Sequence, residues 1–127
     1  MGALTDDGEV AGLKFLTGQG GTLGTLYLAL STGSPNTPSD SQAGSAVSGG
    51  SYARQAVTFA TPSSGSTSNS SDVVFTDMPA TTVTHVELYT ASTGGTRIWY
   101  GELASSKTTS SGDTFTIPAG SLVLTLD

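Results

Sequence analysis

The stretch that decides the fold is "TVTHVELYTASTGGTRIWYGEL", residues 82–103. Apolar and polar residues alternate through residues 82–91, which is the pattern of a half-buried β-strand. The strand pattern resumes in residues 96–103 after "STGG", whose paired glycines favour a tight turn. The sequence therefore predicts a β-hairpin. Its first strand is expected to place Val86 and Leu88 on one face, opposite Val83, His85, Glu87 and Tyr89.

Further stretches with a two-residue period lie on both sides of this hairpin. Polar segments rich in Ser, Gly and Pro separate them, the longest being residues 31–50 and 61–71. Counting gives roughly seven or eight short strands, which is typical of an antiparallel sandwich. The sequence therefore predicts an all-β fold, an antiparallel β-sandwich or jelly-roll-like arrangement with one short N-terminal helix. The remaining strands are expected at residues 22–30, 52–59, 72–76, 113–117 and 121–127.

The segment with a helical pattern is residues 4–17, "LTDDGEVAGLKFLT". Thr5 or Asp6 can cap its start, acidic residues fill its first turn, and Gly18 can end it. Two internal glycines weaken an isolated helix by about 1 kcal/mol each, so this helix needs a surface to dock against. That surface is either the chain's own sheet or a neighbouring subunit. The candidate interface residues on the apolar face are Val10, Leu13, Phe15 and Leu16.

This pattern divides the chain into two parts. Residues 1–21 form an N-terminal helical or anchoring segment that ends in the glycine-rich link "GQGG". Residues 22–127 form the β-sandwich domain. A length of 127 residues suits one such domain with its own core.

Charge and composition narrow the range of partners. The chain has four Lys and Arg against ten Asp and Glu, for a net charge of −6. The basic residues are scattered, whereas phosphate binding needs them clustered, so we expect no nucleic acid partner. We expect no membrane association, since no apolar run is long enough to span a bilayer and no export signal opens the sequence. The absence of cysteine removes disulfides and thiolate chemistry.

The sequence contains few residues of the types that catalyse reactions or bind metal ions. His85 is the only histidine, and Glu87 lies on the same face of its strand. A lone histidine on a strand is most often a surface or interface residue, and no G-x-S-x-G nucleophile motif accompanies it. The acidic residues are spread along the chain and do not form a calcium-loop pattern. We therefore expect a non-enzymatic protein with no cofactor and no bound metal, in which His85 and Glu87 are structural or interface residues.

Aromatic side chains on alternating strand positions have two interpretations. Tyr52, Tyr89, Trp99 and Tyr100 can offer stacking faces to a sugar, with loop hydroxyl and amide groups supplying the polar contacts. The interpretation that we favour is that they form core or cross-strand contacts. Tyr52, Tyr89 and Trp99 are therefore candidate structural or interface residues.

One of the four basic residues lies in the strand entry "SGGSYARQAVTFA", residues 48–60. Its two glycines allow the chain to turn, and the alternation that follows places Tyr52 and Arg54 on one face. We expect Arg54 to lie flat against Tyr52 or to pair with a carboxylate of an adjacent strand or subunit. Either contact would tie down the end of the 31–50 loop, which makes Arg54 a structural residue.

Four blocks of the sequence, within residues 22–127, carry a family resemblance. They are "TLYLALSTGSP", "VSGGSYARQAVTFA", "SDVVFTDMPATTVTHVELYTASTGG" and "WYGELASSKTTSSGDTFTIPAGSLVLTLD". Together they resemble a family of small tailed-bacteriophage virion proteins, whose members are labelled phage tail fibre proteins or head decoration proteins. The resemblance implies a structural protein on the outer surface of the virion, assembled in the host cytoplasm. It also implies a symmetric homo-oligomer, with a trimer favoured.

The resemblance leaves two locations open. A capsid decoration (cement) protein would bind the outside of the head, contact the major capsid protein and stabilise the shell. A tail fibre or tail-tip protein would take part in host attachment, and the long 31–50 loop and the aromatic residues suit contact with a host-surface glycan. We favour decoration, because 127 residues leave little length for a fibre shaft. A third class, a glycan-binding lectin-like module, predicts a pocket centred on Trp99 or His85.

Overall fold

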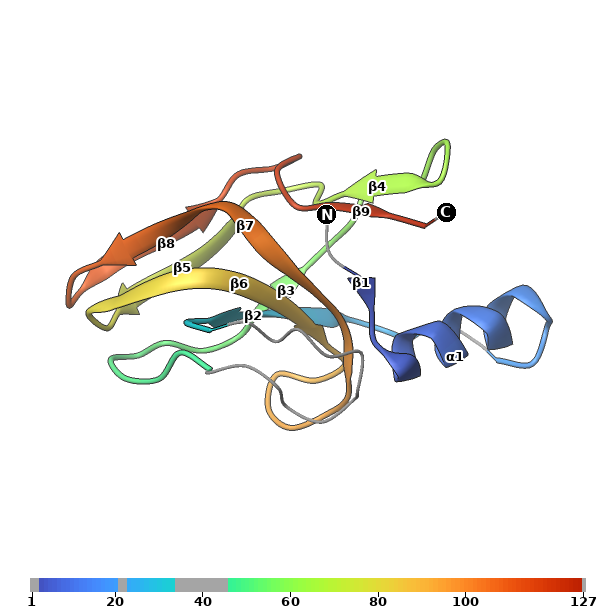
Figure 1. Cartoon of the computed structure of the whole chain (residues 1–127), viewed down its shortest axis with the longest axis horizontal. Coiled ribbons are helices and arrows are strands. Elements are labelled where there is room, and N and C mark those ends of the chain that lie inside the picture. The colour runs from blue at the N-terminus through green and yellow to red at the C-terminus, as the bar shows by residue number, and fades with distance from the viewer. Residues whose placement is uncertain (1–2, 21–22, 34–45, 127) are drawn as a thin grey trace.

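The computed structural model describes residues 3–20, 23–33 and 46–126 (Figure 1). Within these ranges the chain forms one helix and a series of short strands, as the alternating pattern predicts. The elements are β1 (Ala3–Leu4), α1 (Asp6–Leu16), β2 (Leu26–Ser31), β3 (Gln55–Val57), β4 (Ser66–Ser68), β5 (Val73–Met78), β6 (Thr81–Tyr89), β7 (Arg97–Thr109), β8 (Asp113–Ile117) and β9 (Val123–Thr125).

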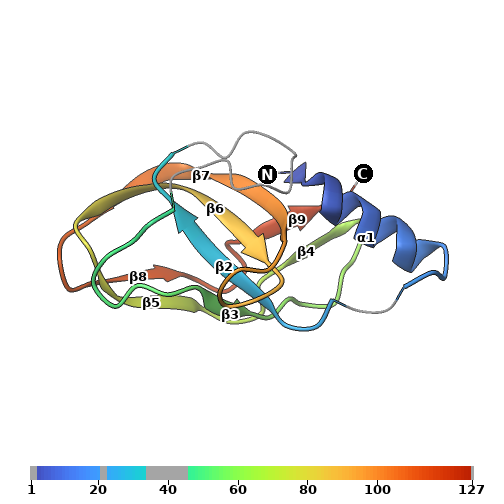
Figure 2. The same cartoon turned by 90° about the horizontal axis from the view of Figure 1, so that it is seen from below.

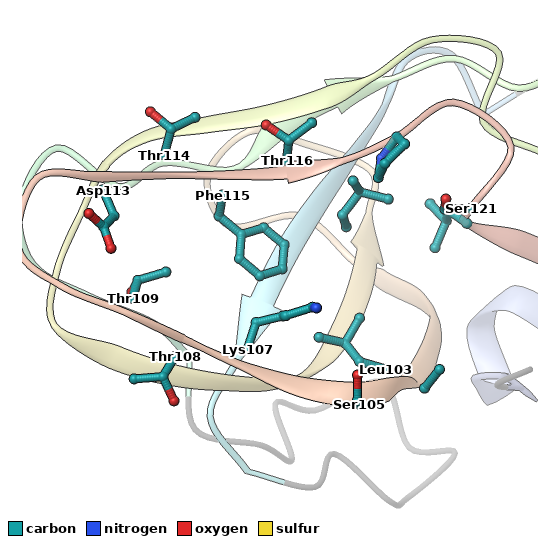
Figure 3. A pocket seen from close by; sticks show the side chains of 14 residues that line it. Leu103, Ser105, Lys107, Thr108, Thr109, Asp113, Thr114, Phe115, Thr116 and Ser121 are labelled. Carbon is teal, nitrogen blue, oxygen red and sulfur yellow. The ribbon is translucent and has the colours of Figure 1, made fainter.

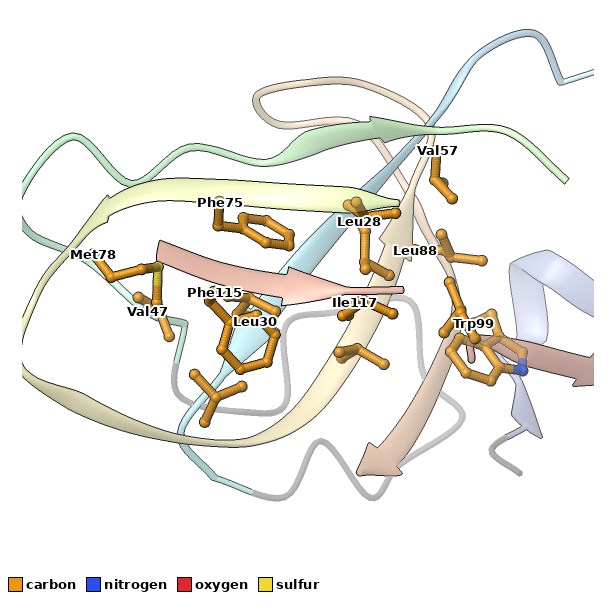
Figure 4. Close-up of a cluster of buried hydrophobic side chains, with 14 of the residues drawn as sticks. Leu28, Leu30, Val47, Val57, Phe75, Met78, Leu88, Trp99, Phe115 and Ile117 are labelled. Carbon is orange, nitrogen blue, oxygen red and sulfur yellow. The ribbon is translucent and has the colours of Figure 1, made fainter. Parts of the chain in front are cut away.

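The strands pair antiparallel throughout the described ranges. The largest sheet has the order β1-β7-β6-β2-β3, and β4-β9 and β5-β8 form two-stranded sheets. The β5-β8 pair lies across the five-stranded sheet, and the buried side chains fill the space between them (Figure 1, Figure 4). The predicted all-β sandwich with a short N-terminal helix is thereby confirmed.

The core takes side chains from both layers. Phe75 and Phe115, on opposite strands of the β5-β8 sheet, meet edge to face with their ring centroids 6.1 Å apart. Trp99 of β7 is only 2% exposed, so it belongs to this core. Removing such apolar surface from water is the main favourable contribution to folding, about 25 cal/mol per Å². Figure 4 also shows Leu28, Leu30, Val47, Val57, Met78, Leu88 and Ile117 in this cluster.

One core residue contradicts the simple alternation of the hairpin. The alternation predicts Val83 opposite Val86, which is wrong, because both are fully buried in the same core. The register between β6 and β7 shifts in this region: Val83 faces Lys107, whereas His85 faces Glu102. A bulge of this kind breaks the two-residue period and turns the next side chains to the other face.

Strand lengths also differ from the prediction. β7 runs on to Thr109, beyond the predicted end at residue 103, and β4 lies within residues 61–71, which were expected to be a loop. Both segments consist largely of Ser and Thr, so they have no apolar alternation to reveal them, and backbone pairing with β6 and β9 holds them in place. In the opposite direction, β3 covers only residues 55–57 of the predicted strand 52–59.

The predicted 31–50 loop is described only in part, since residues 34–45 lie outside the described ranges. The described residue Val47 is 4% exposed and joins the core, and its N–H donates a hydrogen bond to the Leu30 carbonyl at 3.1 Å. The end of this segment is therefore anchored by a buried apolar side chain and by a backbone hydrogen bond to β2.

Helix α1 starts as predicted. The Thr5 hydroxyl caps it by accepting a hydrogen bond from the Gly8 N–H at 3.1 Å, and it donates one to the Arg97 carbonyl at 2.6 Å. Gly8 is buried, and a Cβ at this position would overlap the carbonyl oxygen of Ile98. The glycine that weakens the isolated helix is thus the residue that lets the helix approach β7 closely.

Strand β1 ties the N-terminal part to the sandwich. Ala3 pairs with Tyr100 and Leu4 with Trp99, which makes β1 an edge strand of the five-stranded sheet. The division into segments 1–21 and 22–127 stays a prediction, but the first of these segments contributes a strand to the main sheet of the second.

Candidate assembly surfaces

Helix α1 carries apolar side chains that are not packed against the rest of the described chain. Val10, Leu13, Phe15 and Leu16, the four predicted interface residues, are 49%, 62%, 62% and 70% exposed. Burying a Leu, Val or Phe side chain that is left in water contributes about 1.5–3 kcal/mol, so a group of this size is typical of an interaction surface.

The way the helix docks explains why these side chains are left exposed. Thr5 and Gly8 meet the carbonyls of β7, so the small side chains at the helix base are the ones turned toward the sheet. Val10, Leu13 and Leu16 follow one another at three-residue spacing and form a stripe along the helix. The helix extends beyond one end of the sandwich in both views (Figure 1, Figure 2). The exposure of Leu13 and Leu16, at 62% and 70%, agrees with this position.

A groove lies between the second half of β7 and β8 (Figure 3). The two strands leave the turn at residues 110–112 and then diverge, because β7 pairs with β6 and β8 pairs with β5. The resulting cavity has a volume of about 450 Å³. Its apolar lining comes from Leu103, Phe115, Ile117 and Leu122.

Charged groups also line this groove. Figure 3 shows the Lys107 side chain pointing into the space beside Phe115. Asp113 lies near the turn, where one of its carboxylate oxygens accepts a hydrogen bond from the Ser110 N–H at 2.7 Å. The groove thus combines an apolar floor with one basic and one acidic side chain.

A second cavity, of about 410 Å³, lies between α1 and the end of the β6-β7 hairpin. Val10, Ala11 and Lys14 line it from the helix, and Ile98 and Leu23 line it from the rest of the chain. Neither cavity was predicted from the sequence, because each depends on how separate elements diverge in space.

Glu87 and Arg97 form a buried ion pair in the five-stranded sheet. Their side chains are 1% and 0% exposed, and Nη1 of Arg97 lies 3.2 Å from Oε2 of Glu87. Burial raises the pKa of the Glu87 carboxyl, and the Arg97 guanidinium acts in the opposite direction. The sequence pattern grouped Glu87 with His85 on a half-solvated face and missed Arg97 as its partner. The signal available was their position on the two strands of one hairpin.

Arg54 holds the β6-β7 hairpin turn. Its guanidinium lies 3.6 Å from the centroid of the Tyr89 ring, and Nη1 donates hydrogen bonds to the carbonyls of Ala91 and Gly94 at 3.0 and 2.7 Å. The prediction that Arg54 stacks on Tyr52 or pairs with a carboxylate is wrong. Arg54 stacks on Tyr89 and donates hydrogen bonds to two carbonyls instead. The reason is that residues 52–54 lie outside β3, so strand alternation does not decide which way they point.

Tyr52 does not stack on Arg54, and it packs into the domain in the manner of the core or cross-strand contact that the sequence pattern favours. Its ring stacks on Phe75 with the centroids 5.9 Å apart, and its hydroxyl oxygen accepts a hydrogen bond from the Leu30 N–H at 2.8 Å. Burial raises the pKa of Tyr52 above its ordinary value, and it does the same for Tyr89. Both tyrosines are therefore parts of the packed structure.

A family model described as podophage GP4 fiber I protein gp80 matches residues 14–125, which is most of the chain. The chain belongs to this family. The match confirms the resemblance to small tailed-phage virion proteins, and it identifies a phage structural protein. No curated protein matches the sequence.

In this family member the remaining predicted site residues lie apart from the two cavities. His85 is half-buried, with Nδ1 2.8 Å from the Thr84 hydroxyl, and Trp99 is in the core. Neither residue lines either of these two cavities. Trp99 offers no face to a sugar.

The described ranges contain no group of three or more His, Cys, Asp or Glu placed to hold a metal ion. Within the same ranges there is no helix with the length and apolar character needed to cross a membrane.

Proposed function

We propose that this family member is a non-enzymatic structural subunit of a phage fibre on the outer surface of the virion, and that it works as a homo-oligomer. The observation that carries the proposal is the apolar stripe of α1, in which Leu13 and Leu16 are 62% and 70% exposed. A surface of this kind on a small, otherwise polar domain fits burial against another subunit.

The placement in a fibre is supported by the description of the matching family, which names a fibre protein. The alternative placement is on the head, as a capsid decoration protein that contacts the major capsid protein. Antibody labelling of intact virions distinguishes them: we expect label at the tail or its fibres. Label spread over the head would overturn the fibre placement in favour of decoration.

A structural rather than catalytic role is supported by what the polar side chains do. Glu87 is bound to Arg97, and Arg54 is bound to the hairpin carbonyls and stacked on Tyr89. These groups, which could otherwise serve an enzyme, hold the fold together.

The proposed partners follow from the apolar stripe and from the family resemblance. The first is a second copy of this chain, with a trimer favoured, and the others are neighbouring virion proteins and, for a fibre, a host-surface glycan. No nucleic acid, membrane or cofactor is part of the proposal.

Self-association is tested by light scattering coupled to size-exclusion chromatography. The wild-type chain should elute as an oligomer, and Leu13→Gln/Leu16→Gln should elute as a monomer with an unchanged circular dichroism spectrum. Val74→Gln is the matched control, because Val74 is an exposed apolar residue (40%) on β5, away from the helix. A wild-type protein that stays monomeric at every soluble concentration would refute the proposal.

A further inference from the structure

Two features of the chain lack a counterpart within the described residues. The first is the apolar stripe of α1, and the second is the groove between β7 and β8. The groove is lined by residues between Leu103 and Leu122, none of which belongs to α1. The helix projects from one end of the sandwich (Figure 1, Figure 2). The stripe and the groove are separate surfaces of one copy, because they share no residue.

We propose that the exposed end of α1 docks into the β7–β8 groove of a neighbouring copy. This inference rests on the self-association proposed above, and it names the surface that receives the helix. An amphipathic helix laid into an apolar groove is a common recognition mode, in which side chains at three- and four-residue spacing serve as anchors. Leu13 and Leu16 are the anchors here, and Phe115 and Ile117 form part of the floor that receives them.

The charges of the two surfaces are complementary. Glu9 lies four residues before Leu13, hence on the same side of the helix. The groove carries Lys107 and Asp113. Docking can therefore bring the Glu9 carboxylate to the Lys107 ammonium.

Such a contact joins two different surfaces. In a two-fold contact the same patch of both subunits meets itself, whereas a helix inserted into a groove connects copies head to tail. Head-to-tail contacts close into a ring when the rotation between copies allows it, and otherwise continue as a filament. The helix end and the groove therefore give each copy one donor surface and one acceptor surface.

Cross-linking tests this arrangement directly, because the chain has no cysteine of its own. Leu16→Cys marks the helix end, and Ser105→Cys marks the groove, which Ser105 lines as an exposed residue. The two full-length variants, one carrying a size tag, are mixed, allowed to exchange subunits and treated with a short bis-maleimide. Thr76→Cys, exposed on β5 and outside the groove lining, is the control.

We expect the Leu16→Cys and Ser105→Cys pair to cross-link several-fold more than Leu16→Cys with Thr76→Cys. Cross-links formed only between two Leu16→Cys copies, in protein that is still oligomeric, would overturn the groove contact and leave self-association standing. Monomeric protein without cross-links would overturn both. Oligomeric protein without helix-to-groove cross-links would overturn the groove contact and leave the groove to another virion protein.

Exchange of the charges gives a second readout. Lys107→Glu should weaken association by roughly fivefold, since it places a carboxylate against Glu9. Adding Glu9→Lys should restore the affinity. Equal affinities in all three proteins would contradict the proposed contact between Glu9 and Lys107.

Discussion

Arg97 and Glu87 form an ion pair of 3.2 Å in which both side chains are withdrawn from water. Taking two charges out of water is costly, and the cost is recovered only while each charge has the other close by. The pair also lies beside the helix base, since the carbonyl of Arg97 accepts the hydrogen bond from the Thr5 hydroxyl. Its loss would therefore disturb both the sheet and the helix attachment.

The first prediction follows from this pair. Arg97→Met leaves the Glu87 carboxylate buried without its cation and should cost about 3–5 kcal/mol of unfolding free energy at neutral pH. Burial already raises the pKa of Glu87, and loss of Arg97 raises it further. A carboxyl group whose pKa is higher in the folded than in the unfolded state does not destabilise the fold below its unfolded pKa, where it is protonated in both states. The free energy of unfolding then decreases as pH rises through the folded-state pKa. The loss should therefore be larger at pH 8 than near pH 4.

Urea denaturation of wild type and Arg97→Met at both pH values measures this effect. The double variant Glu87→Gln/Arg97→Met removes the titrating group, so the difference between the two pH values should shrink. The same loss of stability at pH 4 and pH 8 in the single variant would contradict a buried, ionised Glu87.

The second prediction concerns the two glycines of α1. Gly8→Ala places a methyl group against the carbonyl of Ile98 and should lower the melting temperature, because the helix base must move away from β7. Gly12→Ala places the same group in open space and should stabilise the protein by up to about 1 kcal/mol through helix propensity. Thermal unfolding of both variants is the measurement. A Gly8→Ala protein as stable as Gly12→Ala would show that the helix does not approach β7 as described.

The third prediction concerns Arg54. Arg54→Ala removes the stacking on Tyr89 and two hydrogen bonds to the hairpin turn, and should cost about 1–2 kcal/mol, a fall of roughly 4 °C in melting temperature per kcal/mol. Arg54→Lys keeps the charge but not the planar group, so it should recover only part of the loss. Wild-type stability in Arg54→Ala would exclude a role in holding the turn.

The fourth prediction concerns alkaline pH. Burial raises the pKa of Tyr52 and of Tyr89. Because the folded-state pKa is raised, these tyrosines leave the free energy of unfolding unchanged below the unfolded-state pKa of about 10. The free energy of unfolding falls as pH rises through the folded-state pKa. Absorbance at the tyrosinate band should show Tyr52 and Tyr89 ionising late, with unfolding. Tyr52→Phe and Tyr89→Phe should each remove one late transition. Ionisation of Tyr52 and Tyr89 near the ordinary pKa, in protein that is still folded, would contradict their burial.

The local sequence pattern was sufficient to predict features that depend on one strand or one helix end alone. The predicted strand 113–117 coincides with β8, and Val86 and Leu88 face the core as the alternation predicts. The helix cap at Thr5 was likewise visible, because capping depends on residues close in sequence. The general prediction of an apolar helix face also identified the exposed stripe.

Features that depend on register or on diverging strands could not be predicted in this way. Val83 changed sides because of a bulge, and the Arg97 partner of Glu87 depends on how β7 is aligned with β6. Arg54 stacks on Tyr89 rather than on Tyr52, because residues 52–54 lie outside β3 and do not follow its alternation. The groove exists only because β7 and β8 join different sheets after their turn. A one-dimensional pattern contains none of these relations.

Strand β7 contributes to both proposed assembly surfaces, with the helix base at Ile98 and the groove from Leu103 onward. Its 13 residues span about 40 Å of extended backbone. In a head-to-tail assembly, a tensile force on the helix of one subunit would be transmitted to β7 of that subunit. It would then pass from the groove to the helix of the next subunit. The load along the row would then be borne by covalent chain within each subunit, and the contacts between subunits would be the points that yield first.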